Sequence, residues 1–510
     1  MFATVSSAVV EGVTGHPVRV EVHVSQGLPG YTLVGLPDAA CRESRDRVRA
    51  AILSSGLTWP LKRVTINLAP SGLRKQGSAL DLPIALGILA ASGQIPAEAV
   101  ETHGAVGELG LDGSVRPVPG LVCLAGAIVT PVVAVPEAGA AEAALVRPEA
   151  TRPVSSLRQL VAALVDDVAL PPPTESGPVG PALADRGDLA DVRGQPLARW
   201  ALEVAAAGGH HLLMVGPPGS GKTMLANRLV GLLPDLGPDE SLVATSVHSA
   251  AGVGLPPGGL VRRPPLRAPH HGASLVSLVG GGTSALRPGE ISCAAAGVLF
   301  LDELGEFAPT ALDALRQPLE EGVVRVARAA RAVTLPARFL LIAAMNPCPC
   351  GEGGPIGECR CSEASRARYA RRLSGPLLDR FDVRVEVRPP PAHLLLGRAR
   401  EESTAEVAER VARARAAARE RGVATNARLS VDQLDEYAPL TAEATAVLRA
   451  ALEAGALTGR GLTRVRTVAR TIADLTGESV IDHDVISGAL ALRAMPTSVL
   501  GKDPQEVRAS

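Results

Sequence analysis

The sequence predicts an α/β protein with three parts: an N-terminal α/β domain, a P-loop core with a parallel sheet, and an all-helical C-terminal unit. Three observations predict this organisation. The apolar run 211–215 is followed at once by a glycine-rich loop and then by a helical pattern. Short β-rich runs alternate with helical ones before residue 165, and helical periodicity alone continues after residue 430. The length of 510 residues is enough for several domains of ordinary size.

Composition and charge limit the classes of function. The formal net charge of -1 excludes a globally basic nucleic-acid binder, so any contact with DNA must come from local patches. Almost every basic residue is arginine, as expected of a GC-rich genome, and arginine clusters are therefore weaker signals than usual. The sequence shows neither a secretory leader pattern nor an apolar run of membrane-spanning length, which predicts a cytoplasmic protein without membrane partners.

Residues 1–165 are predicted to form a separate α/β domain. The run 18–24 alternates polar and apolar residues, 64–68 has the composition of a strand, and 80–91 fits a buried helix. The later stretch 107–121 resembles a strand-turn-strand unit of the Lon-type protease domain. That resemblance implies a Lon-like fold for the N-terminal domain.

The residues of a Lon-type peptidase site are not all present in this domain. When the sequence is compared with the Lon-type domain, Asp81 lies nearest the position of the nucleophilic serine, and Val122 lies near the position of the lysine. Without a serine-lysine pair, no neighbouring amine can activate a nucleophile. The domain is therefore predicted to be non-proteolytic, with Ser78 as the weaker alternative nucleophile.

Residues 166–190 are proline-rich and lack periodic apolar positions, which predicts an extended linker before a core at 191–390. At the start of this core, Val192 and Gln195 precede a helical stretch that leads into the strand before the P-loop. In ATPases of the AAA+ class, which this order resembles, such a segment lies beside the adenine. Val192 and Gln195 are thus candidates for the base pocket.

The glycine-rich loop has the residues that binding of a nucleotide phosphate requires. Its glycines let backbone N–H groups close around phosphates, and the helix that follows adds positive potential at its N-terminus. Lys222 is predicted to reach the β- and γ-phosphates, and Thr223 to ligate Mg²⁺. The predicted loop consists of Gly216, Pro217, Pro218, Gly219, Ser220, Gly221, Lys222 and Thr223.

A long segment rich in glycine, proline, histidine and arginine follows at 242–291 and predicts inserted loops in the core. Within it, His270 and His271 have two interpretations: turn capping and packing, or contact with a threaded substrate or a neighbouring subunit. Long loops of this kind often carry function.

The apolar run 297–301 ends in two acids, which is a Walker B pattern. Asp302 is predicted to hold the Mg²⁺ shell, and Glu303 to polarise the attacking water. Further along, 323–334 predicts a hairpin with an arginine-rich tip. In a ring this tip could face the pore and meet phosphates, whereas in the simpler interpretation it is a solvated face.

The strand predicted at 339–345 ends at Asn346, the place where AAA+ proteins carry a polar residue that fixes the lytic water. Four of the seven cysteines follow within a short segment, which favours a metal site over a disulfide framework. Four thiolates at this spacing could bind Zn²⁺ tetrahedrally, and free or redox-labile thiols are the alternative. The four are Cys348, Cys350, Cys359 and Cys361.

Arg380 lies in a segment where ring ATPases place an arginine that points into the nucleotide of the adjacent subunit. After it, 391–429 predicts a connecting helix, 430–497 a helical lid, and 498–510 a tail. Within the lid, Arg460 is the first candidate for the sensor-2 arginine that contacts the γ-phosphate, and Arg464 is the second.

Taken together, these motifs resemble the magnesium chelatase-like AAA+ ATPases of the ComM/YifB type over nearly the whole chain. The most specific stretches are 289–292, 300–304, 346–351 and 374–380. The resemblance implies an ATPase that uses ATP and Mg²⁺ and assembles as a homo-oligomeric ring, expected to be a hexamer. It also implies a DNA helicase that promotes branch migration.

Two functions remain open on the sequence: a DNA motor, and a chelatase-like or chaperone-like ATPase that remodels another protein. Both need the same ATPase residues, so only the surface that meets the substrate distinguishes them. Basic residues on the inserted loops and the hairpin favour nucleic acid, although the general preference for arginine weakens this signal. These residues are Arg262, Arg263, Arg267, Arg325, Arg328 and Arg331.

Overall fold

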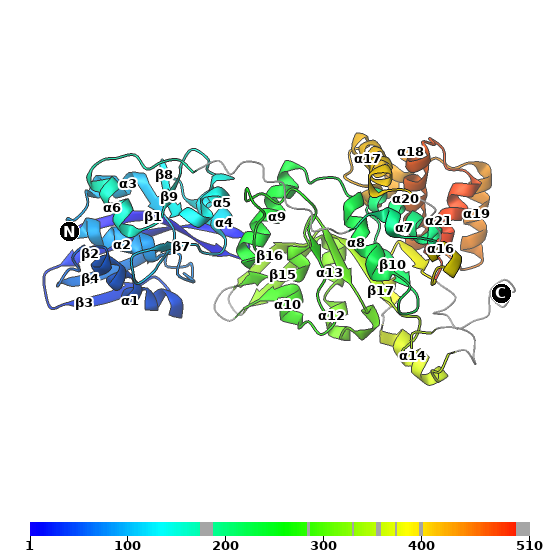
Figure 1. The fold of residues 1–510 in the computed structure, drawn as a ribbon, viewed down its shortest axis with the longest axis horizontal. Helices are drawn as coiled ribbons and strands as arrows, with labels where there is room; N and C mark the ends of the chain where they lie inside the picture. Colours follow the sequence, from blue (N-terminus) through cyan, green and yellow to red (C-terminus); the bar gives the residue numbers. More distant parts are fainter. Residues whose placement is uncertain are drawn as a thin grey trace.

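The computed structural model describes residues 1–173, 187–282, 286–328, 331–352, 359–372, 375–396 and 401–495. Part of the expected linker, the expected tail and Ser374 lie outside the described residues, as do the side chains of Arg328 and Arg331. The molecule is elongated, with the N-terminal unit at one end and the helices of the C-terminal unit at the other (Figure 1). None of the described helices is long and apolar enough to cross a membrane.

The N-terminal unit contains a four-stranded sheet in the order β1-β2-β4-β3. Helix α2 (Asp81–Ala91) packs on β1 and β2, and all of its residues are buried because they are apolar apart from Asp81 at its start. Helix α1 (Ala39–Ser54) lies beside α2. The strands are β1 (Phe2–Glu11), β2 (Thr14–Ser25), β3 (Gly30–Val34) and β4 (Arg63–Ala69).

The second half of this unit holds a smaller parallel sheet in the order β5-β8-β9. Its strands are β5 (His103–Ala105), β8 (Val132–Pro136) and β9 (Thr151–Val154), and a short hairpin pairs β6 (Glu108–Leu109) with β7 (Val115–Arg116). The helices are α3 (Ala97–Thr102), α4 (Leu121–Ala127), α5 (Ala140–Ala144) and α6 (Leu157–Val165). The predicted α/β character of this region is therefore observed.

The core contains a five-stranded parallel sheet in the order β11-β14-β17-β10-β18. Strands β10, β14 and β17 are buried at every residue, as expected of a parallel sheet covered on both faces. Because neighbouring strands run in the same direction, the carboxyl ends of these three strands meet at one edge. The strands are β10 (Leu212–Val215), β11 (Leu266–Arg267), β14 (Val298–Leu301), β17 (Leu340–Met345) and β18 (Val383–Glu386).

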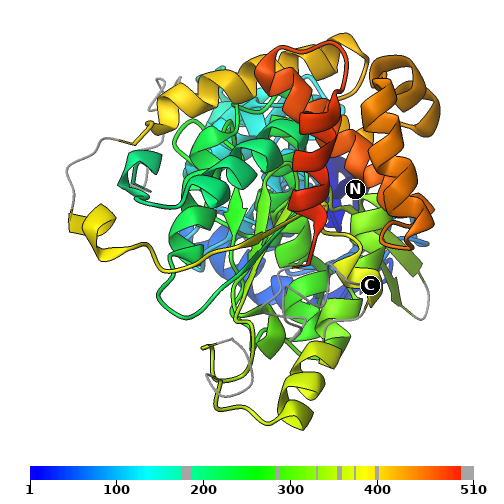
Figure 2. The same cartoon turned by 90° about the vertical axis from the view of Figure 1, so that its right-hand side faces the viewer.

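One face of this sheet is covered by helices that come before and after the other core strands in the sequence. Helices α7 (Pro196–Gly208) and α8 (Lys222–Leu232) pack against α17 (Thr404–Glu420), and α7 also contacts α20 (Gly459–Thr476). Figure 2 shows α17, in gold, running across the top beside the orange and red helices of the C-terminal unit. That unit consists of α18 (Val431–Tyr437), α19 (Ala442–Glu453), α20 and α21 (His483–Arg493).

The inserted segments lie on the side of the core that faces the N-terminal unit (Figure 1). They comprise α9 (Pro238–Ala251), α10 (Leu275–Val279), α11 (Glu290–Cys293) and the antiparallel hairpin of β15 (Val323–Arg328) and β16 (Arg331–Pro336). The turn between β1 and β2 reaches the hairpin, and a Cβ added to Gly12 would lie 2.6 Å from Cγ1 of Val333. Gly120 N donates to Ser249 O at 2.9 Å. The N-terminal unit is thus packed directly on the insertions.

Candidate functional site

The glycine-rich loop connects the carboxyl end of β10 to the start of α8. Gly219 and Gly221 have φ values of 76° and 94°, in the left-handed region that favours glycine. A Cβ placed on either residue would meet no atom within 4 Å, so space next to the loop is open at both glycines. This arrangement fits an oxyanion held by backbone N–H groups, as in a phosphate.

Lys222 lies at the centre of the loop. Its Nζ donates to Gly216 O at 2.7 Å, to Pro217 O at 2.8 Å and to Asn346 Oδ1 at 3.3 Å. Burial lowers the pKa of Lys222, and the charge of Asp302 opposes that shift. The Nζ group can therefore exchange carbonyl partners for phosphate oxygens without leaving the site.

Thr223 and Asp302 come from different elements and meet at the carboxyl edge of the sheet. Thr223 Oγ1 donates to Asp302 Oδ2 at 2.7 Å, and Asp302 Oδ1 accepts from the backbone N of Glu303 at 2.9 Å. A hydroxyl and a carboxylate are hard oxygen ligands of the kind that Mg²⁺ prefers. The donor set thus fits the magnesium ion that the sequence predicts.

Glu303 follows Asp302 in a strained backbone conformation. Its φ of 53° and ψ of 48° place it in the left-handed region, which costs a residue with a side chain about 1 kcal/mol. Such strain persists where the surrounding structure holds the residue in place. The side chain of Glu303 is about half exposed, directly after Asp302 in the chain.

His271 is the functional-site residue that the sequence interpretation did not place. Its Nδ1 lies 2.9 Å from Glu303 Oε2, and its ring meets Phe307 edge-on with centroids 6.5 Å apart. His271 follows β11, which pairs with β14, the strand that carries the two acids. Of the two interpretations given above, packing explains the Phe307 contact, but neither anticipated the pairing with Glu303. Strand order, which is not readable from sequence, creates it.

Asn346 lies at the carboxyl end of β17, the neighbour of β10 in the sheet. Because Val215 pairs with Met345, the side chain of Asn346 lies beside Lys222. The structure therefore brings Lys222, Thr223, Asp302, Glu303 and Asn346 together at one edge, as their places at three strand ends predict.

Val192 and Gln195 lie beside the loop but are engaged in holding it. Gln195 Nε2 donates to Ser220 O at 3.2 Å and also to Arg388 O, and Val192 is buried in the core cluster. Ser220 Oγ is buried and has no hydrogen-bond partner among the described residues. Gln195 thus holds the P-loop through Ser220, and the place of Val192 and Gln195 beside the adenine stays a prediction.

The four clustered cysteines converge directly after Asn346. Their ligand atoms all lie within 4.8 Å of one another, with Sγ–Sγ distances of 3.3 Å for Cys348 and Cys350 and 3.4 Å for Cys348 and Cys359. Four thiolates around one Zn²⁺ would lie about 3.8 Å apart, from Zn–S bonds of about 2.3 Å. Backbone N–H groups of Cys350 and Cys361 also point at sulfur atoms. This donor set fits a tetrahedral Zn²⁺ site.

The cysteine cluster touches the nucleotide loop. A Cβ added to Gly351 would lie 2.6 Å from Cδ of Pro218, so only a glycine permits this approach. Backbone hydrogen bonding from Glu352, followed by a side-chain bond with Cys348, lowers the pKa of Cys350 to about 6. The segment that follows Asn346 therefore packs against one wall of the P-loop.

Arg380 lies just before β18, at the amino ends of the parallel strands and thus opposite the P-loop. Its side chain pairs with Glu320, and its Nε is buried with no hydrogen-bond partner among the residues that the structure describes. Asp382 N donates to the carbonyl of His211 at the amino end of β10. Arg380 and the P-loop of the same chain are thus separated by the length of a strand.

The two candidate sensor-2 arginines also lie at this amino edge. Arg464 Nη1 is 3.0 Å from Asp382 Oδ1, while Arg460 is exposed. Burial opposes ionisation of Asp382, but bonding from His210 and the charge of Arg464 lower its pKa to about 2. Burial lowers the pKa of Arg380, and Arg460 and Arg464 lower it further. Both arginines lie at the strand ends opposite the P-loop of the same chain, and their contact with a γ-phosphate stays a prediction.

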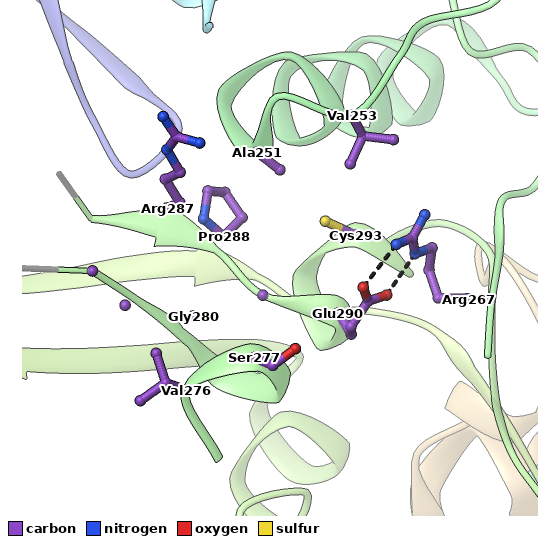
Figure 3. Close-up of a pocket in the computed structure, with 13 residues that line it drawn as sticks. Ala251, Val253, Arg267, Val276, Ser277, Gly280, Arg287, Pro288, Glu290 and Cys293 are labelled. Carbon is purple, nitrogen blue, oxygen red and sulfur yellow. Dashed lines mark hydrogen bonds and ion pairs between the residues drawn. The ribbon is translucent and has the colours of Figure 1, made fainter. Parts of the chain in front are cut away.

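Several arginines expected to face nucleic acid are instead paired with acids. Arg267 forms a bidentate ion pair with Glu290, with distances of 2.6 and 2.8 Å, on the wall of a pocket of about 270 Å³ (Figure 3). Arg325 lies 2.6 Å from Glu321, and Arg263 lies 3.7 Å from Asp235. Arg262 is exposed. The arginine-rich surface is therefore less free for phosphates than its sequence suggested.

In the N-terminal unit, the residues compared above with the serine and lysine of a Lon-type site are hydrogen-bonded or buried within the unit. Arg47 donates to both carboxylate oxygens of Asp81, at 2.7 and 3.1 Å, and Leu109 N donates to the same side chain. Ser78 donates to Glu108, and Val122 is buried. Burial raises the pKa of Asp81 to about 6 against the effect of Arg47. Asp81 thus fixes the start of α2.

Comparisons with known proteins cover nearly the whole chain. Three family models match: magnesium chelatase, subunit ChlI, at residues 188–394; subunit ChlI of Mg-chelatase at 20–132; and the ChlI C-terminal model at 401–493. An uncharacterised protein of Mycobacterium tuberculosis is 46% identical over 96% of this chain and 97% of its own. YifB of Escherichia coli is 43% identical, over 95% of both chains. Competence protein ComM of Haemophilus influenzae is 43% identical, over 97% of both chains.

Proposed function

The chain belongs to the magnesium chelatase-like family that includes YifB and ComM, and on that premise we propose that it is a ring-forming, ATP-hydrolysing AAA+ motor that acts on DNA. The observation that carries the ATPase proposal is the bond from Thr223 Oγ1 to Asp302 Oδ2 at 2.7 Å, beside Lys222. A P-loop and an acidic strand end in this relation form a Mg²⁺-nucleotide site.

Each residue has a specific part in the proposed hydrolysis. Lys222 neutralises charge on the phosphates, and Thr223 with Asp302 would hold Mg²⁺, which supplies further neutralisation when bound. Glu303 accepts a hydrogen bond from the attacking water, and Asn346 orients that water from the neighbouring strand. The contact of His271 with Glu303 fixes the carboxylate beside Asp302.

The proposed site is complete only with a second copy of the chain. Arg380 lies at the amino edge of the sheet, so it can stabilise transition-state charge only on a nucleotide held by a neighbour. We extend this proposal to Arg460 and Arg464, which lie at the same amino edge. A closed ring in which the carboxyl edge of one sheet faces the amino edge of the next satisfies every copy, and a hexamer is the proposed form.

Replacement of Arg380 by alanine is expected to lower ATP hydrolysis by about 100-fold while ATP still binds, because the lost charge acts only in the transition state. Arg449→Ala, an exposed change of the same charge on α19, is the control. Mixing the Arg380→Ala and Lys222→Ala chains should restore part of the activity, since the first has intact P-loops and the second has intact arginines. Mixtures no more active than either chain alone would contradict a shared site.

DNA is the proposed substrate because of the relatives and not because of a free basic surface. One relative bears the name competence protein ComM, and the family resemblance implies branch migration. The decisive assay is ATP-dependent strand displacement or branch migration on forked DNA by the purified protein. If neither displacement nor salt-sensitive DNA binding occurs, the chelatase-like or chaperone-like remodelling of a protein substrate replaces this proposal.

We also propose that Cys348, Cys350, Cys359 and Cys361 bind one structural Zn²⁺. Purified protein should contain about one zinc per chain, and Cys359→Ser with Cys361→Ser should remove it and lower the ATPase rate, because the cluster packs against Pro218. Cys41→Ser, whose thiol bonds to Gly77 O far from the cluster, is the control. Fully active protein without zinc would argue for free thiols instead.

The N-terminal unit is proposed to be a Lon-like, non-proteolytic domain. Its contacts with α9 and with the β15–β16 hairpin link it to the inserted segments of the core. A substrate or partner bound by this unit could therefore affect the insertions without reaching the nucleotide.

A further inference from the structure

A second cavity lies at the amino edge of the core sheet, at the opposite end of β10 from the P-loop. It has a volume of about 720 Å³ and is lined by the starts of β10 and β17, the beginning of α9 and the end of α17. The short helix η4 (Asn426–Arg428) closes another side. Its volume lies in the range of pockets that hold small organic ligands. Arg464, which is proposed to act on a neighbour's nucleotide, is part of the wall, whereas no other lining residue has a part in the proposed hydrolysis.

The cavity wall carries as many acids as arginines, but most of the acids are already paired. Asp382 pairs with Arg464, Glu320 with Arg380, Glu321 with Arg325 and Asp235 with Arg263. Glu240 is the remaining acid of the wall, and its carboxylate accepts a bond from Gly237 N in the cap of α9.

Four arginines on the wall face this single acid. Among the described residues, Arg338, Arg415, Arg419 and Arg428 have no ion-pair partner within 4.0 Å, although Arg415 Nε donates to Ala206 O at 2.8 Å. Burial lowers the pKa of Arg415 to about 10; Arg419 and Arg428 add to this effect and Glu240 opposes it. Burial, and then Arg338, lower the pKa of Arg428 as well. The four guanidinium groups therefore repel one another around the cavity.

We propose that this arginine cleft, defined by Arg338, Arg415, Arg419 and Arg428, binds the polyphosphate of a nucleotide at a site separate from the P-loop. Guanidinium groups bind phosphate oxygens through paired N–H donors, and a polyphosphate has enough charge to relieve repulsion among four cations. The cavity is of nucleotide size, which favours a compact polyphosphate over an extended nucleic-acid strand.

The test uses the full-length chain with Lys222→Ala, so that the P-loop cannot account for binding. Inorganic triphosphate, titrated calorimetrically at physiological salt, is expected to bind at about one site per chain. Adding Arg419→Gln and Arg428→Gln should weaken this binding by about tenfold or more. The control adds Arg413→Gln and Arg449→Gln, which remove the same charge from exposed positions away from the cleft.

Arg338→Gln is a second variant on a different element and should weaken binding in the same direction, which keeps the test informative if the double variant unfolds. Failure of the Lys222→Ala chain to bind triphosphate, or equal weakening by the control pair, would overturn the proposal. So would arginine-dependent binding of a thymidine 12-mer with no binding of triphosphate. Because no DNA motor is needed for any of these readouts, the result is independent of the proposed function.

Discussion

A Glu303→Gln chain is expected to bind ATP like the unaltered protein and to hydrolyse it at least about 100-fold more slowly. The amide keeps the size of the side chain but cannot accept a proton from water at neutral pH. Thr223, Asp302 and Lys222 are unchanged, so the contacts proposed to hold Mg²⁺ and the phosphates remain. The substitution therefore separates binding from chemistry.

Steady-state phosphate release and equilibrium binding of a fluorescent ATP analogue measure the two effects of this substitution. Glu306→Gln is the matched control, because Glu306 is an exposed acid three residues further on that pairs with Arg372. It should leave both quantities within about twofold. Full turnover by the Glu303→Gln chain would remove Glu303 from its proposed role and direct attention to another base near the loop.

A Lys222→Ala chain is expected to lose ATP binding by at least about 100-fold, because no other lysine or arginine has a described contact with Gly216 O or Pro217 O. The thermal stabilisation that ATP gives should be lost with it. A ligand at 100 times its Kd adds about 2.7 kcal/mol to the free energy of unfolding, which is readily measured as a shift in Tm.

Lys62→Ala is the control for this second substitution, since Lys62 is an exposed lysine in the N-terminal unit. Its ATP-dependent shift in Tm should equal that of the unaltered chain. The measurement is made with Mg²⁺-ATP at about 100 times the Kd of the unaltered protein, where a 100-fold loss of affinity removes most of the shift. An unchanged shift for Lys222→Ala would contradict the assignment of the loop.

Much of the candidate site could be predicted from local sequence. A strand, a glycine-rich loop and a helix are adjacent in the chain, so the place of Lys222 and Thr223 needs no knowledge of distant residues. Asp302 and Asn346 each follow an apolar run, and parallel strands bring their carboxyl ends to one edge. The four cysteines lie close in sequence, which predicted their convergence.

The contacts that the sequence did not predict depend on strand order and on the packing of distant elements. His271 reaches Glu303 because β11 is the neighbour of β14. Arg267 and Arg325 were expected to be free for phosphates, but Glu290 and Glu321 neutralise them. A run of arginines in the sequence shows that a segment is positively charged. Which acidic side chains pair with those arginines depends on the folded structure.

By itself, then, the sequence determined the α/β class, the P-loop, the acidic strand end and the family to which the chain belongs, because each is written in contiguous residues. The tertiary structure alone decided which edge of the sheet each arginine occupies. Arg380 and Arg464 lie at the amino ends of strands whose carboxyl ends hold the nucleotide loop, and the proposal that they act on a neighbouring copy rests on this separation. The arginine cleft likewise exists only because α9, α17, η4 and β17 meet around one cavity.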